Sequence, residues 1–215
     1  MRHLFHDGSH LLNPWQALTS AGDSALLLPL IAWISLWLIV PAQTRREGWR
    51  WAFAVCACGG GVALSKLLFM AWGVGLPGLD YTGFSGHSAM SMLVWPTMAA
   101  LLTQRASLNW RSVAVCIAVV LALGIAVSRI LLKAHSVSEV ILGSSYGILI
   151  CGWFLMRRSA AYQVSARAVA LFAGIGLALA LACYGRVFPS QHILKQLALD
   201  ISGRDKVFSR VTLPH

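Results

Sequence analysis

Charged residues, and acidic residues above all, are scarce in this sequence. Only 11% of the 215 residues are charged, and Asp and Glu together number 7. Soluble domains usually carry about 25% charged residues. With 58% hydrophobic residues and a mean hydropathy of +0.71, the composition excludes an ordinary soluble domain. It predicts an integral membrane protein whose length suits one compact bundle.

The few acidic residues do not gather in the sequence, so no acidic cluster offers a magnesium site. The cysteines do not indicate a metal site either, because Cys56 and Cys58 are too close in sequence for the usual zinc pair. All five cysteines lie in or beside apolar stretches, where we expect small buried side chains. We therefore expect neither a metal nor a cofactor.

Long apolar segments make up most of the chain. Six of them are long enough, or nearly so, to cross about 30 Å of hydrocarbon, and their continuous pattern favours helices. They cover roughly residues 24–42, 51–73, 87–103, 111–133, 137–156 and 167–185. The predicted fold class is all-α, a polytopic membrane protein with a six transmembrane helix bundle over residues 1–185.

A less apolar tail follows at residues 186–215. Its segment SQHILKQLALDI suits a helix that lies on the membrane surface. A disordered tail is the simpler interpretation, and the sequence leaves both open.

The basic residues give the predicted bundle an orientation. Lys and Arg number 17, and the formal net charge is +10. Arginines gather in the first, third and fifth loops, whereas residues 74–86 contain no Lys or Arg. The positive-inside rule places the arginine-bearing loops in the cytoplasm, so we interpret the charge as topology and expect no nucleic acid partner. The expected location is a bacterial inner membrane, with the 74–86 loop and the site beside it toward the periplasm.

Ionisable residues inside apolar segments are costly and therefore indicate function. On this topology they all fall toward the outer end of the bundle: Lys66, His87, Arg129, Lys133, His135 and Glu139. Cations and free helix N-terminal amides bind phosphate. One histidine can attack phosphorus, and the other can protonate the leaving oxygen. This inventory fits metal-independent phosphoryl transfer.

Two short motifs carry a family resemblance. FSGH at 84–87 and SRILLKAHSVSE at 128–139 resemble the type 2 phosphatidic acid phosphatase superfamily, which includes vanadium haloperoxidases. The pattern of that family is KxxxxxxRP, then PSGH, then SRxxxxxHxxxD. Five residues separate Arg129 from His135, and three separate His135 from Glu139, as the third motif requires.

The resemblance implies a role for each matching residue. His135 is the nucleophile and forms a phosphohistidine, Glu139 orients it, and His87 is the general acid for the leaving group. The residues implied to hold the phosphate oxygens are Lys66, Ser85, Gly86 and Arg129.

The match departs from the family pattern at three places. Gly73 and Val74 stand where the family has Arg-Pro, so one phosphate-binding cation is missing unless Lys133 substitutes for it. Phe84 replaces the usual proline. Glu139 stands where the family has aspartate, which keeps the charge on a longer arm.

Simpler roles are open for some of these side chains. Ser136 and Glu139 have the spacing of a capping box before an apolar run, and one carboxylate can serve both a cap and a histidine. Lys66 and Lys133 are also able to snorkel to the membrane interface.

The resemblance implies a membrane phosphatase that hydrolyses a lipid phosphate or diphosphate. Undecaprenyl diphosphate is our first choice, followed by phosphatidylglycerophosphate and phosphatidate, and membrane lipids are the other expected partners. A lipid phosphotransferase, for example onto lipid A, and a non-catalytic lipid-binding or transport protein stay open. GFSG at 83–86, with His135 downstream, also matches a rhomboid-like intramembrane serine protease, but that interpretation leaves Lys66 and Arg129 without a role.

Overall fold

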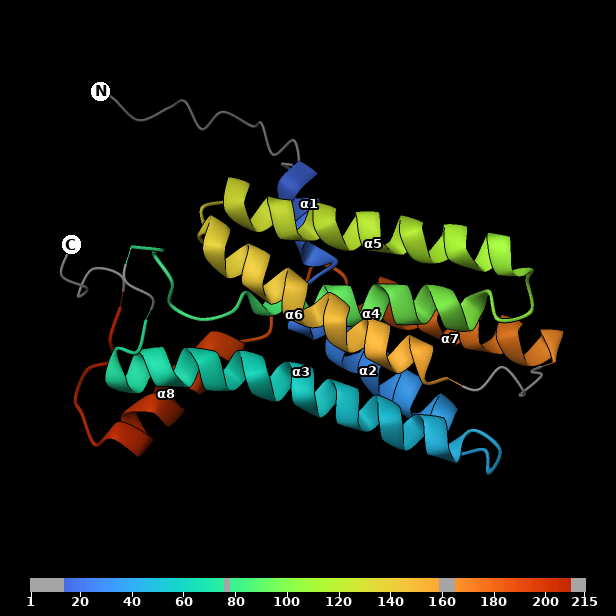
Figure 1. The fold of residues 1–215 in the computed structure, drawn as a ribbon, viewed down its shortest axis with the longest axis horizontal. Coiled ribbons are helices and arrows are strands. Elements are labelled where there is room, and N and C mark those ends of the chain that lie inside the picture. The colour runs from blue at the N-terminus through green and yellow to red at the C-terminus, as the bar shows by residue number, and fades with distance from the viewer. Residues whose placement is uncertain (1–13, 76–77, 159–164, 210–215) are drawn as a thin grey trace, which may run out of the picture.

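The computed structural model describes residues 14–75, 78–158 and 165–209. Helices account for the regular structure of these ranges, which contain no strand, so the predicted all-α class is confirmed (Figure 1). In chain order they are α1 (Pro14–Ser20), α2 (Ser24–Ile39), α3 (Arg45–Trp72), α4 (Gly86–Leu102), α5 (Leu108–Leu131), α6 (Val137–Met156), α7 (Ala166–Cys183) and α8 (Ser190–Ser202).

Five helical segments of the described chain are long and apolar enough to cross a membrane: Pro14–Ile39, Arg45–Trp72, Leu108–Leu131, Val137–Met156 and Ala166–Cys183. The predicted third span corresponds to α4, which has 17 residues. A helix of that length extends about 26 Å, somewhat less than the hydrocarbon core of about 30 Å. The structure therefore supports a helical membrane protein with five candidate spans, and the sixth span, a crossing by α4, stays a prediction.

Most helix bounds follow the apolar segments closely, and α3 is the exception. It begins at Arg45 rather than at residue 51 and has 28 residues, a length of about 42 Å. Its first turn is charged and contains Glu47, whose carboxylate interacts favourably with the helix N-terminus. Since the helix is longer than the hydrocarbon core, this charged turn can extend past it.

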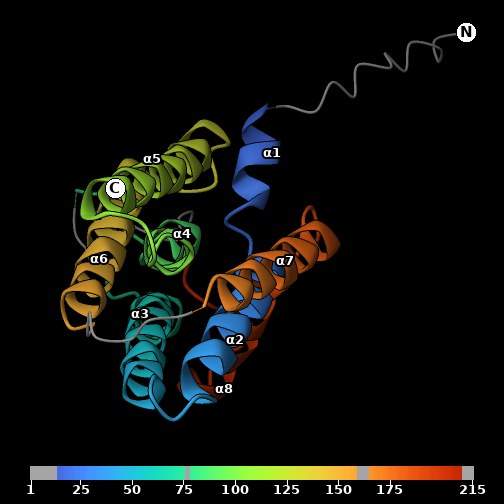
Figure 2. The ribbon, with the colours of Figure 1, turned by 90° about the vertical axis from the view of Figure 1, so that its right-hand side faces the viewer.

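Helix α4 forms the centre of the bundle. It contacts α2, α3, α5, α6 and α7, and Figure 2 shows it between α5 and α6 on one side and α2 and α7 on the other. Its packing against α6 depends on two glycines one turn apart. A Cβ at Gly143 would come within 2.8 Å of the Ser85 carbonyl oxygen, and one at Gly147 within 2.2 Å of the Ala89 carbonyl oxygen. The two backbones can approach this closely only because neither glycine has a side chain.

The two ends of the bundle differ in chemistry. The α2–α3 loop, the α4–α5 loop and the end of α6, which carry the arginines of the predicted cytoplasmic loops, lie at one end in Figure 1. The loop before α4, the α5–α6 junction and α8 lie at the other end. Helix α8 packs against α3, so the tail contains a helix at residues 190–202; whether that helix lies on a membrane stays a prediction.

Candidate active site

The predicted nucleophile and its partner lie at the junction of α5 and α6. His135 Nδ1 is 2.6 Å from Glu139 Oε2, and both side chains are buried. The other ring nitrogen, Nε2, is free of this contact. A carboxylate at Nδ1 orients the ring and leaves Nε2 with the lone pair that a nucleophile needs.

Glu139 also serves as a helix cap. Ser136 is the N-cap of α6, and the Ser136 hydroxyl and the Glu139 carboxylate complete a capping box with each other's backbone N–H groups. The capping box is therefore confirmed, and the contact with His135 is compatible with the orienting role, which stays a prediction. Its position in the first helical turn brings the carboxylate back over the N-cap, within reach of His135 just before the helix.

The loop before α4 is tied to the same carboxylate. The backbone N–H of Thr82 donates to Glu139 Oε1 at 2.8 Å, and the Thr82 hydroxyl donates to the same oxygen. The backbone N–H of Ser85 donates to the Glu139 carbonyl at 3.1 Å. These bonds hold the SGH turn beside the nucleophile, although the bonded residues lie more than fifty positions apart in sequence.

Gly83 brings this loop against the buried lysine. Its φ of 124° suits glycine, and a Cβ there would lie 2.8 Å from the Lys66 Cγ and 3.0 Å from its backbone nitrogen. Lys66 is 7% exposed. Because Gly83 has no side chain, the loop can pack closely against α3 at Lys66.

His87, in the first turn of α4, pairs with an acid that sequence reasoning missed. Its Nε2 lies 3.5 Å from Asp23 Oδ2. Asp23 is the N-cap of α2, where its other oxygen accepts from the backbone N–H groups of Ala25 and Phe188. The Asp23 carboxylate thus lies within ion-pair distance of the ring that the family resemblance makes the general acid.

Arg129 points toward the same region from the end of α5. Its Nη1 donates to the Thr19 hydroxyl at 2.9 Å. Its Nε is buried and has no hydrogen-bond partner among the residues that the structure describes. A buried donor of this kind is costly to leave unpaired, and an anion would satisfy it.

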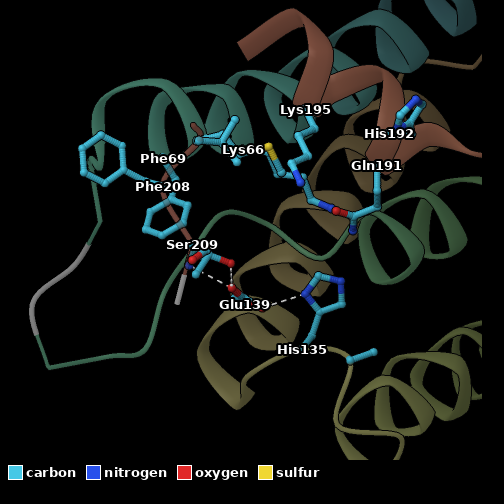
Figure 3. A pocket seen from close by; sticks show the side chains of 13 residues that line it. Lys66, Phe69, His135, Glu139, Gln191, His192, Lys195, Phe208 and Ser209 are labelled. Atoms are coloured by element: carbon cyan, nitrogen blue, oxygen red, sulfur yellow. Dashed lines mark hydrogen bonds and ion pairs between the residues drawn. The ribbon is translucent and has the colours of Figure 1, made fainter. Parts of the chain in front are cut away.

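Two cavities meet at Lys66. The smaller, about 410 Å³, contains His135 and Glu139 in its lining, and Figure 3 shows these two side chains facing each other below α8. The larger, about 590 Å³, is lined by His87, Gly86 and Arg129. Lys66 and Gln191 line both. The two predicted catalytic histidines therefore line two cavities that share one buried cation.

Two residues predicted to bind phosphate, Ser85 and Lys133, lie outside the two cavities. The Ser85 hydroxyl is fully buried and accepts from Ser88, as the N-cap of α4, and it lines neither cavity. Lys133 is exposed, has a φ of 53°, and lines neither cavity. The structure thus does not bring Lys133 to the position of the missing cation.

The environment of His135 favours its neutral form. Burial lowers the pKa of His135 below its ordinary value of 6.5, and the charges of Lys66 and Arg129 act in the same direction. The hydrogen bond to Glu139 opposes these effects without outweighing them. A neutral imidazole at neutral pH is the form that can attack phosphorus.

No group of three or more His, Cys, Asp or Glu side chains that could hold a metal ion occurs within residues 14–75, 78–158 and 165–209. The expectation of metal-independent chemistry stays a prediction, because only an activity assay can test it.

Comparison with known proteins points to the family that the motifs indicate. The model of the PAP2 superfamily matches residues 61–163. A protein of Klebsiella pneumoniae described as "Uncharacterized 22.5 kDa protein in cps region" is 37% identical over 204 residues, which cover 93% of this chain and 97% of the relative. No solved structure matches the chain.

Fold and motifs together define a helical membrane protein of the phosphatase type. The chain belongs to the PAP2 superfamily. Members of this superfamily are phosphatases, which supports phosphoester hydrolysis of a lipid phosphate as its activity.

Proposed function

We propose that this protein hydrolyses a lipid phosphate or diphosphate through a phosphohistidine on His135. One observation carries the proposal. His135 and His87 line two cavities that share Lys66, so an attacking atom and a leaving atom can lie on opposite sides of one phosphorus. In-line displacement of a phosphoryl group requires that arrangement.

The first step forms a bond between His135 Nε2 and phosphorus. The bond from phosphorus to the leaving oxygen breaks, and His87 donates its proton to that oxygen. Lys66 and Arg129 neutralise charge on the phosphoryl oxygens. For a lipid monophosphate the leaving group is the lipid alcohol, and for a diphosphate it is the lipid monophosphate.

The second step regenerates the free enzyme. Neutral His87 accepts a proton from water, whose oxygen attacks phosphorus and breaks the bond to His135. Inorganic phosphate leaves, and both histidines regain their starting protonation states. A lipid hydroxyl in place of water would make the protein a phosphotransferase.

The larger cavity supports a lipid as the substrate. Apolar side chains of α2, α4 and α8 line it next to His87, among them Leu27, Ile31, Met90 and Leu194. The chain of the leaving group would lie against them, and the phosphate would reach Lys66. We propose undecaprenyl diphosphate as the first candidate, ahead of phosphatidylglycerophosphate and phosphatidate, and a periplasmic site in a bacterial inner membrane.

The test is phosphate release by the detergent-purified protein, in EDTA, from each of these lipids. The variants His135→Ala and Ser85→Ala run beside the wild type. Release that is lost in His135→Ala and retained in part by Ser85→Ala supports the proposal. Complete loss in Ser85→Ala, with proteolysis by the wild type, would support the protease instead.

A labelled phosphate separates the remaining alternatives. Acid quenching during turnover of a ³²P-labelled lipid should trap label on the wild type and none on His135→Ala. Label transferred to added lipid A, with little free phosphate, would identify a phosphotransferase. The absence of both release and trapped label for all lipids would overturn the proposal and favour a non-catalytic lipid-binding or transport protein.

A further inference from the structure

The end of α3 cannot supply the arginine that the family pattern places at position 73. Gly73 caps α3 with a φ of 70°, a conformation that residues with a side chain rarely adopt. The ring of Phe208 occupies the space beside it, since a Cβ at Gly73 would lie 3.1 Å from two ring atoms. A segment of the tail has therefore taken the place of that side chain.

The tail is fastened to α3 at this point. The backbone N–H of Phe208 donates to the Met70 carbonyl oxygen at 2.9 Å, and the Arg204 guanidinium lies 4.8 Å from the centre of the Phe208 ring. Helix α8, directly before this segment, packs against the same helix, α3. These contacts fix one face of α8 above the smaller cavity.

That face of α8 carries polar side chains. Gln191 and Lys195, one helical turn apart, line the smaller cavity together with Lys66, His135 and Glu139. Figure 3 shows the side chains of Lys195 and Gln191 extending from α8 toward the space above His135 and Glu139. Lys195 is thus a cation on the nucleophile side of the site.

The opposite side of α8 is apolar, and an apolar face can hold the helix at a membrane surface. Leu197 and Ile201, four residues apart, are 41% and 52% exposed and line neither cavity. An amphipathic helix with such a stripe lies in a membrane interface. Its polar face then remains turned toward the bundle.

We propose that Lys195 binds the phosphoryl oxygens at His135 and replaces, from the C-terminal helix, the cation that the first motif lacks. Gln191 donates an amide hydrogen bond beside it. This inference rests on the proposed function for the identity of the substrate, but binding of the anion itself can be measured without turnover. The ligand class is a phosphate monoester or diphosphate headgroup, or inorganic phosphate as the product.

The experiment measures inorganic phosphate binding to the purified full-length protein by isothermal titration calorimetry, and kcat/KM on the best lipid. The variants are Lys195→Met and Lys195→Gln, with Lys195→Arg as the conservative change. Lys206→Met is the matched control, because Lys206 is an exposed lysine of the same tail that lines neither cavity.

Loss of one charge-assisted hydrogen bond should weaken phosphate binding and lower kcat/KM about 10- to 100-fold in Lys195→Met and Lys195→Gln. Lys195→Arg should retain most of both, and Lys206→Met should match the wild type. A purely structural role of Lys195 would change the melting temperature and leave the phosphate affinity of the folded protein unchanged.

The outcomes separate the two proposals. Wild-type affinity for phosphate in Lys195→Met, or no phosphate binding by the wild type, overturns the role of Lys195. If Lys195→Met binds phosphate as tightly as the wild type and the wild type hydrolyses lipid, the proposed function stands without the role of Lys195. If no lipid is hydrolysed but phosphate binds and the binding weakens in Lys195→Met, the role of Lys195 stands and the proposed function fails.

Discussion

At the scale of single residues, the Glu139 carboxylate joins three parts of the site. One oxygen contacts His135 and the N–H of Ser136, and the other accepts from Thr82. The side chain is fully buried, so these protein groups take the place of the water that the carboxylate would otherwise bind. A change at Glu139 should therefore affect the orientation of His135 and the position of the SGH loop together.

Glu139→Gln tests this coupling. The amide keeps the size of the side chain but loses the charge that orients and stabilises the imidazole, so kcat/KM should fall at least about 10²-fold. Phosphate release measures the loss, and the melting temperature is its control. Activity within about threefold of the wild type would contradict the orienting role and leave Glu139 as a cap alone.

The dependence of kcat/KM on pH, on its acidic side, should report the protonation of His135. Burial lowers the pKa of His135 below 6.5, so the neutral nucleophile persists as the pH falls through 6.5 and is lost only at lower pH. The acidic limb of kcat/KM against pH is expected below pH 6.5. A limb above pH 6.5 would mean that His135 is protonated more easily than its surroundings predict.

At the scale of helices, the contact between α4 and α6 controls the distance between the SGH turn and the nucleophile. Two glycines of α6 lie directly on the backbone of the α4 N-terminus. Another glycine of α6, Gly152, has no atom within 4 Å of the Cβ it lacks. The same helix therefore offers a sensitive position and a matched insensitive one.

Gly147→Ala should lower the melting temperature and the activity, because its Cβ would meet the Ala89 carbonyl oxygen at 2.2 Å and push the helices apart. The expected cost is about 1–3 kcal/mol. Gly152→Ala should be neutral or slightly stabilising, since alanine favours helix by up to about 1 kcal/mol over glycine. Equal melting temperatures for the two variants would contradict the close α4–α6 contact.

Gly73→Arg restores the residue of the family pattern and tests the end of α3. An arginine there would have to adopt a left-handed backbone, at about 1–2 kcal/mol, and would displace the Phe208 ring. We expect lower stability and lower kcat/KM than in the wild type. A gain of activity would show instead that position 73 still reaches the phosphate.

At the scale of the whole molecule, the arginine-bearing loops and the candidate site lie at opposite ends of the bundle (Figure 1). The positive-inside rule then predicts a cytoplasmic arginine end and a site on the other side of the membrane. Alkaline phosphatase fused after residue 80 should be active, and the same fusion after residue 106 should be inactive. The reverse pattern would place the site in the cytoplasm.

Much of this molecule could be predicted from sequence because the apolar segments are long and the third motif is local. The bounds of α6 follow from its apolar segment, and the pairing of His135 with Glu139 follows from their short separation across the helix N-cap. The contacts of Thr82 and Asp23 could not be predicted, because each joins segments far apart in the chain through one side chain. Sequence reasoning considered Lys133 as a substitute for the missing cation, whereas the approach of Lys195 to the cavity depends on the folding of the tail and has no local signal in the sequence.

The contact between Gly73 and the Phe208 ring has an evolutionary consequence. The two positions cannot both hold large side chains, so they should vary as a pair among relatives. Chains that keep arginine at the position of Gly73 should have a small residue, or no tail, at the position of Phe208. Searches that demand the complete first motif would pass over proteins like this one, and a helix after the last span with a lysine facing the site would be the better marker for them.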